Sequence, residues 1–263
     1  MKTYEFGDKS KPVILLLAGT CCHWKNSFSE VIPLLERSFY VVCVSYDGFD
    51  ETEDTIFPSM IDEAERIEEY IQRCFGGKAF CAYGCSLGGS FVGLLVQRGR
   101  IHIDHGIIGS SDLDQSGRLA AGLQAHVIAP ILRGMLRKGR LPSWMNSWMG
   151  KRSQEERFYL EKMLSMFGIG TTKMAFVKSK SIYNQFYSDL VTPLDDKIRA
   201  DGTVIHCFYA EKMGERYLSR YEQHFLNPDI RRHPMQHEEL LTCYPSEWVD
   251  EVESCCGISE DMP

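Results

Sequence analysis

Short, continuous runs of apolar residues recur along the chain, and helical spacing of apolar residues fills the stretches between the first four. Runs of this kind are typical of strands that are buried on both faces of a parallel sheet. The alternation predicts right-handed crossovers and an α/β fold, with a mostly parallel central sheet flanked by helices. The five runs cover residues 13–18, 39–46, 79–83, 103–108 and 203–209.

The helical patterns between these runs have recognisable ends. Residues 27–37 and 87–97 carry apolar side chains near helical spacing, and a third, longer pattern begins at Pro58. Proline is well tolerated in the first turn of a helix, and the Gly76-Gly77 pair is a common way to end one. Because ligand sites in open parallel sheets form at the carboxyl ends of the strands, we expect functional residues in the loops after the apolar runs.

The segment 114–200 interrupts this alternation, because it holds no clear strand and is rich in methionine and aromatic residues. We predict a helical cap, inserted after the fourth strand, that buries its own apolar face and presents part of it over a site. Residues 1–113 and 201–263 then form the core. The helix-like stretches of the predicted cap are 119–137, 154–167 and 172–187.

The pentapeptide Gly84-Cys85-Ser86-Leu87-Gly88 matches the G-x-S-x-G nucleophile elbow and stands between an apolar strand and a small-residue helix. In such an elbow a sharp turn holds the middle serine in strained backbone geometry and exposes its hydroxyl. Ser86 is therefore the predicted nucleophile. A thiolate is intrinsically more nucleophilic, but Cys85 is not at the projecting position, and we expect it to be a small buried packing residue.

A serine nucleophile needs a general base, and the base needs a carboxylate that orients it. His237 lies in a loop after a short predicted strand at 229–233, where it would hang over the carboxyl edge of the sheet. We predict His237 as the base. His233, inside that strand, is the weaker alternative, and His23 could line the site.

Three carboxylates are candidates for the acid. Glu211 comes just beyond the run 203–209 and is the first choice, and Glu215 is the second. Asp112, beyond the run 103–108, is the third. For each of them the competing interpretation is a surface carboxylate without a catalytic role.

Acyl transfer builds negative charge on a carbonyl oxygen, and one preorganised N–H donor stabilises it by roughly 3 kcal/mol. The backbone N–H of Leu87, at the start of a helix, and that of Thr20, after the first apolar run, are the predicted oxyanion-hole donors. The neighbouring Cys21-Cys22-His23 cluster lacks a second pair at ligand spacing, so no metal site is predicted.

These motifs resemble those of the α/β-hydrolase superfamily over nearly the whole chain. LLLAGT resembles the strand and loop that supply an oxyanion donor, AYGCSLGGS the elbow, YAEKMGERY the acid-bearing turn and MQHEELL the histidine loop. Two positions depart from the family pattern. Ala18 stands where histidine often precedes Gly19, and Met213 occupies the usual aspartate position of the acid turn.

The resemblance implies the α/β-hydrolase fold and a serine esterase-like enzyme that needs no cofactor. The expected reaction is hydrolysis of an ester, thioester or similar acyl bond in a small, partly apolar substrate, through an acyl-enzyme. Two alternatives stay open. Met213 favours a non-catalytic small-molecule binding protein with a degenerate triad, and the same fold also supports lyase or acyltransferase chemistry.

Composition adds expectations about partners. The net charge of −7 gives no general attraction to nucleic acid, and the basic patch at 133–140 is expected to be a solvated face. The first residues carry no apolar segment of a signal peptide, and the apolar run 13–18 is too short to cross a bilayer. Ten cysteines without an export signal indicate free thiols in a reducing compartment. We therefore expect a cytoplasmic protein with no membrane partner.

Overall fold

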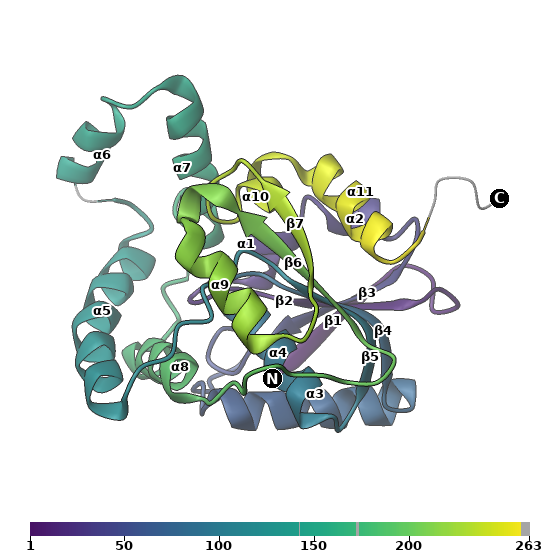
Figure 1. The fold of residues 1–263 in the computed structure, drawn as a ribbon. Helices are drawn as coiled ribbons and strands as arrows, with labels where there is room; N and C mark the ends of the chain where they lie inside the picture. The colour runs from purple at the N-terminus through teal and green to yellow at the C-terminus, as the bar shows by residue number, and fades with distance from the viewer. Residues whose placement is uncertain (142, 172–173, 259–263) are drawn as a thin grey trace.

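The computed structural model describes residues 1–141, 143–171 and 174–258. Its centre is a seven-stranded sheet in the order β1-β3-β2-β4-β5-β6-β7 (Figure 1). β1 is antiparallel to β3, and every other neighbouring pair is parallel. The strands are β1 Lys2–Phe6, β2 Val13–Leu17, β3 Tyr40–Ser45, β4 Lys78–Gly84, β5 His102–Ile108, β6 Val204–Ala210 and β7 Asp229–His233.

The predicted fold class is confirmed, since the five apolar runs form β2 to β6 and the short segment before His237 forms β7. The edge strand β1 was not predicted from the sequence. Its residues KTYEF alternate polar and apolar side chains and are mostly half-buried, because the strand pairs with a neighbour on one side only. An edge strand of this kind lacks the continuous apolar run that marks a strand buried on both faces.

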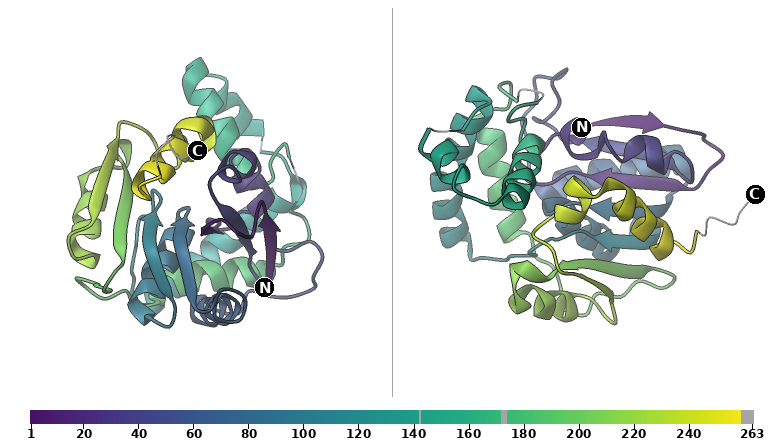
Figure 2. Two further views of the ribbon diagram at one scale, coloured as in Figure 1. Left: turned by 90° about the vertical axis from the view of Figure 1, so that its right-hand side faces the viewer. Right: turned by 90° about the horizontal axis from the view of Figure 1, so that it is seen from above.

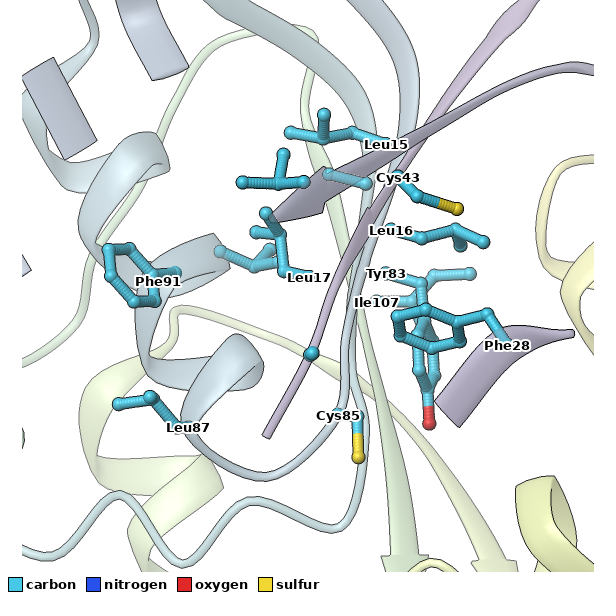
Figure 3. Close-up of a cluster of buried hydrophobic side chains, with 14 of the residues drawn as sticks. Leu15, Leu16, Leu17, Phe28, Cys43, Tyr83, Cys85, Leu87, Phe91 and Ile107 are labelled. Carbon is cyan, nitrogen blue, oxygen red and sulfur yellow. The ribbon is translucent and has the colours of Figure 1, made fainter. Parts of the chain in front are cut away.

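Helices cover both faces of the sheet, with α3 and α4 on one face and α2 and α11 on the other (Figure 1). Leu17 and Phe91 pack on the side of α4, whereas Leu16, Phe28 and Tyr83 gather on the opposite side of β2 (Figure 3). The helices of this part of the chain are α1 Trp24–Phe28, α2 Ile32–Leu35, α3 Met60–Phe75, α4 Leu87–Arg98, the 3₁₀ turn η1 Glu211–Met213, α9 Glu215–His224, α10 Glu239–Cys243 and α11 Pro245–Cys255.

Two helical predictions differ from the structure. The segment 27–37 is not one helix but parts of the short helices α1 and α2, the second of which has a proline in its first turn. The last helix of the predicted cap begins at Ser179 and not at residue 172. Met174 and Val177 are fully buried in a turn that precedes it. Residues 172 and 173 lie outside the described part of the chain.

In the described residues between β5 and β6 there are four helices, and α5 to α7 lie together beyond one end of the sheet (Figure 2). α5 packs against α8, and α7 packs against α1 and α10. α5 is long and apolar enough to cross a membrane, by length and composition alone. The boundaries of a cap at 114 and 200 stay a prediction. The four helices are α5 Arg118–Lys138, α6 Ser143–Met149, α7 Gln154–Met166 and α8 Ser179–Val191.

Candidate active site

The turn between β4 and α4 has the strained geometry of a nucleophile elbow. Ser86 adopts φ 50° and ψ −113°, a conformation that L-residues rarely take. The flanking glycines make the turn possible: a Cβ on Gly84 would lie 2.0 Å from the Gly88 carbonyl, and one on Gly88 would lie 2.2 Å from the Leu17 carbonyl oxygen. Strand, turn and helix therefore pack backbone on backbone, and Ser86 stays half-exposed at the top of the sheet.

Cys85 is fully enclosed beneath the turn, as expected for a packing residue. Burial raises the pKa of its thiol well above the ordinary value, and the nearby negative charge of Glu238 raises it further. The thiolate form that a nucleophile requires is thereby disfavoured. The other nine cysteines are also unbonded to one another, so all ten, which lie within the described residues, are free thiols.

The loop after β2 lies against the elbow. A Cβ built on Gly19 would be 3.4 Å from the Cβ of Ser86, so the next residue, Thr20, is close to the nucleophile. Cys21 has a positive φ of 58°, and its N–H donates a hydrogen bond of 2.7 Å to Oε1 of Gln185 in α8. Among the described residues, neither the Thr20 nor the Leu87 backbone N–H has a hydrogen-bond acceptor. Both predicted oxyanion donors are therefore unused.

A buried glutamate that the sequence analysis did not single out fixes the elbow to the histidine loop. Oε1 of Glu238 accepts a hydrogen bond of 2.9 Å from the Ser86 N–H, and Oε2 accepts one of 2.8 Å from the Tyr83 hydroxyl. Glu238 is 3% exposed and has a positive φ of 53°. A Cβ on Gly109 would be 2.8 Å from Oε1, so this glycine makes room for the carboxylate.

One sequence signal pointed toward such a residue. Tyr83 sits inside an apolar strand, and a buried tyrosine hydroxyl usually finds a hydrogen-bond partner. The buried hydroxyl requires a partner near the carboxyl end of β4, but the sequence does not identify which residue provides it. Glu238 looks like a polar residue at the start of a helix, and only the tertiary contact reveals its role.

His237 is held next to the elbow, since its neighbour Glu238 is bonded to Ser86. From the side of α7, the Tyr159 hydroxyl donates a hydrogen bond of 3.0 Å to the His237 backbone carbonyl. Nδ1 of His237 is buried and has no partner among the described residues. Within that part of the chain, no hydrogen bond joins the imidazole to Ser86 or to a candidate acid.

The three candidate acids occupy different environments. Glu211 is exposed in η1, and its carboxylate lies 3.6 Å from the Arg232 guanidinium. Glu215 is exposed at the start of α9. Asp112 is half-buried after β5; burial raises its pKa above the ordinary value, and the His237 charge acts in the opposite direction. The His237 imidazole is thus one of the groups that act on the Asp112 carboxyl.

The remaining histidines near this edge have other surroundings. His23 is buried, its Nε2 lies 2.7 Å from a Glu51 carboxylate oxygen, and its Nδ1 accepts the Lys25 N–H at 3.2 Å. These contacts cap α1 and leave no ring nitrogen free. His233 ends β7, and burial lowers the pKa of its imidazole. Its ring packs edge-on against Phe208 at a centroid distance of 5.5 Å.

One group away from the elbow has the donor types of a metal site. His206, Asp229 and Cys255 each place one donor atom within 4.8 Å of the others. The Asp229 carboxylate already accepts hydrogen bonds from His206, at 2.8 Å, and from Arg231, at 2.9 Å. Burial raises the pKa of the Cys255 thiol to about 12, which disfavours the thiolate that binds metals. The Arg231 cation and the protonated thiol fit a structural cluster better than a metal centre.

No family model and no curated protein matches the sequence. The structure is similar to that of a protein assigned to the α/β-hydrolase family from Desulfitobacterium hafniense, with a TM-score of 0.77, 17% identity and coverage of 96% of this chain and 99% of that one. A hydrolase from Pseudomonas aeruginosa gives a TM-score of 0.70 at 14% identity, covering 97% and 93%. The enol-lactonase from Burkholderia xenovorans gives 0.64 at 13%, covering 97% and 96%. The chain has the α/β-hydrolase fold.

Proposed function

We propose that this α/β-hydrolase-fold protein is a serine hydrolase that cleaves an ester, thioester or similar acyl bond through an acyl-enzyme. The observation that carries the proposal is the bond between Glu238 and the Ser86 N–H, which holds the neighbouring His237 beside a strained elbow. The unused N–H groups of Thr20 and Leu87 lie at the same place. The proposed nucleophile, base and oxyanion donors thus come from three loops at one edge of the sheet.

In the proposed reaction, Ser86 Oγ attacks the carbonyl carbon of the substrate and its proton passes to His237. The N–H groups of Thr20 and Leu87 donate to the oxygen on which negative charge develops. Collapse of the tetrahedral intermediate expels the alcohol or thiol, which takes the proton from His237. A water molecule then gives a proton to His237 and attacks the acyl carbon. Collapse of this second tetrahedral intermediate breaks the bond to Ser86 Oγ, which takes the proton back from His237, and the carboxylic acid is released.

We favour Asp112 as the carboxylate that orients His237. Its charge couples to the imidazole, and the buried Nδ1 of His237 needs an acceptor. The Arg220 guanidinium donates a hydrogen bond of 2.6 Å to the Asp112 backbone carbonyl and pairs with Asp114, which fixes the segment that carries Asp112. Glu211, with Arg232 beside it on the surface, remains the alternative.

For the substrate we propose a small, partly apolar ester or lactone. Structurally similar proteins are described as a marine esterase, with a TM-score of 0.67, and as an enol-lactonase, with a TM-score of 0.64. The loop that carries Thr20 is bonded to Gln185 of α8, so the helices between β5 and β6 reach the site and are the elements that would select the substrate.

A fluorophosphonate probe tests the proposal, with p-nitrophenyl acetate and butyrate as substrates. We expect stoichiometric labelling, and we expect Ser86→Ala to abolish labelling and to lower kcat by about 10⁴-fold or more. Cys85→Ala is the matched control, since it changes the adjacent residue and removes a thiol that is buried. Labelling that survives in Ser86→Ala and disappears in Cys85→Ala would assign the nucleophile to the thiol instead.

A second candidate function is a small-molecule binding protein on the same fold. The unpartnered Nδ1 of His237 and the presence of Met213 in the acid turn favour it. A folded protein that takes up no probe at Ser86, yet is stabilised against heat by a small apolar acid or ester, would support binding without catalysis. Lyase or acyltransferase chemistry on the same serine would give labelling together with a product other than the free acid.

A further inference from the structure

Helix α5 has two apolar faces, and the residues that the structure describes cover only one of them. Ala121, Ala125 and Ala129 are buried at intervals of four residues, where the helix packs against α8. The small side chains allow close approach: a Cβ on Gly122 would be 3.7 Å from the Tyr183 hydroxyl of α8. This alanine face accounts for the attachment of α5 to the rest of the molecule.

The opposite face of α5 is an apolar stripe of four residues, each four positions after the one before. Because a helix turns about 100° per residue, this stripe lies roughly half a turn from the alanine face. Its members are the most exposed large apolar side chains among those the structure describes. They are Leu119 (93% exposed), Leu123 (70%), Val127 (57%) and Ile131 (59%).

Charge is segregated around the stripe. Residues 115–154 contain seven lysines and arginines and no aspartate or glutamate, although the whole chain carries −7. Arg118 stands at one end of α5, and Arg137, Lys138 and Arg140 stand at the other; all four are exposed. In the described part of the chain, none of these four has an ion-pair partner. An apolar stripe is thus flanked by unneutralised positive charge.

α6, the next helix along the chain, carries an exposed aromatic residue. The Trp148 ring is 42% exposed, and the Arg152 guanidinium lies 4.3 Å from its centroid. α5 and α6 both lie at the periphery of the molecule, away from the sheet (Figure 1). Tryptophan is enriched at the boundary between lipid headgroups and acyl chains, and arginine can bury its stem there while its charged end stays in water.

We propose, in place of the expectation from composition that the protein has no membrane partner, that α5 and α6 dock it on the surface of an anionic lipid membrane. The apolar stripe would enter the boundary of the acyl chains, and the basic residues would contact the headgroups, as in helices that lie in the plane of an interface. α5 does not span the bilayer in this arrangement, because its alanine face is packed against α8. The charge of residues 115–154 selects this occupant over a second copy of the chain, which would bring a second set of seven basic residues to the interface.

The experiment is co-sedimentation of the full chain with vesicles of phosphatidylcholine alone or with about one third phosphatidylglycerol. We expect binding to the anionic vesicles only, with an affinity that falls as the salt concentration rises. Leu123→Glu/Val127→Glu, which removes the centre of the stripe, should weaken binding by about tenfold or more. Arg137→Glu/Lys138→Glu, which leaves the stripe intact, should weaken it to a similar degree.

The matched control is Ile56→Glu/Leu226→Glu, which places the same two charges at exposed apolar positions outside α5. It should bind the anionic vesicles as the unchanged protein does, and thermal unfolding by circular dichroism should show that all variants are folded. Absence of binding, equal binding to both kinds of vesicle, or equal loss in the control would overturn the proposal. So would a dimer in light scattering that Leu123→Glu/Val127→Glu dissociates while vesicles are not bound, because the stripe would then belong to a second copy.

Discussion

The nucleophile elbow and helix α5 both depend on glycine and apolar residues, but the two regions use them differently. At the elbow, an added Cβ on Gly84 or Gly88 would overlap backbone atoms, whereas a Cβ on Gly134 of α5 would meet nothing within 4 Å. Leu87 at the elbow is buried, and Leu123 on α5 is 70% exposed. The elbow is therefore fixed by packing on all sides, whereas α5 is attached to the rest of the described chain by one face.

This difference explains which features could be read from the sequence. The spacing of the elbow motif is imposed by contacts between backbone atoms, so the strained turn at Ser86 could be predicted from five residues. A helix attached by one face leaves the other face undetermined by the fold. The exposed apolar stripe on that face therefore needs an explanation other than packing within the part of the chain that the structure describes.

Replacing the proposed acid should change the rate of catalysis more than any other substitution in this comparison. It also tests whether the loop after β5 belongs to the elbow region. Asp112→Asn is expected to lower kcat for p-nitrophenyl butyrate by about 10³-fold or more, since the imidazole would lose its orienting carboxylate. Glu211→Gln is the matched change at the exposed alternative. The acidic limb of the pH–rate profile should move to lower pH only in the Asp112 variant, because that variant removes a negative charge that favours the protonated imidazole. The reverse ranking of the two variants would assign the acid to Glu211.

The glycines give the next largest effect. Gly88→Ala should lower the free energy of unfolding by more than about 3 kcal/mol, or prevent folding, because its Cβ would sit 2.2 Å from the Leu17 carbonyl oxygen. Gly134→Ala should instead raise it by about 0.5–1 kcal/mol, since alanine is the better helix former and has open space there. Urea denaturation followed by circular dichroism measures both. Equal changes in the two variants would remove the contrast between the regions.

Much of the fold was predictable, and the limits of the prediction have physical causes. The runs that became β2 to β6 are buried on both faces, so their sequences are continuous and apolar. β1 escaped notice because an edge strand is only half covered. Glu238 was not predicted, because a buried carboxylate is recognised by the donors that surround it. Here the donors are Ser86 and Tyr83, about 150 positions away in the chain. The choice among the acids depends on loop geometry that spacing does not encode.

Glu238 gives the third prediction, on stability. Glu238→Ala leaves the Ser86 N–H and the Tyr83 hydroxyl without a partner in a buried place, so it should lower the free energy of unfolding by about 2–4 kcal/mol. Glu238→Gln is the matched control, because its amide oxygen can still accept from the Ser86 N–H and its NH₂ group can donate to the tyrosine oxygen. We expect it to lose less than half as much in thermal or urea unfolding. If both variants were as stable as the unchanged protein, the two hydrogen bonds of Glu238 would not contribute to the stability of the fold.

The last prediction concerns Asp189 of α8, where the helices between β5 and β6 meet α4. Burial raises the pKa of this carboxyl to about 8, and the negative charge of Asp112 adds to the shift, while a hydrogen bond from Ser90 opposes it. The folded protein therefore keeps a proton that the unfolded chain releases near pH 4, so the contribution of Asp189 to stability is present below that pH and is lost as the pH rises to about 8. Asp189→Asn, which cannot ionise, should be more stable than the unchanged protein at pH 8 by at least about 1 kcal/mol, with a smaller difference at pH 5. Asp195→Asn, which changes an exposed carboxylate in the segment after α8, is the matched control. Parallel stability curves for Asp189→Asn and the unchanged protein between pH 5 and 8 would mean that Asp189 is already ionised in the folded state, and that water reaches the junction between the two regions.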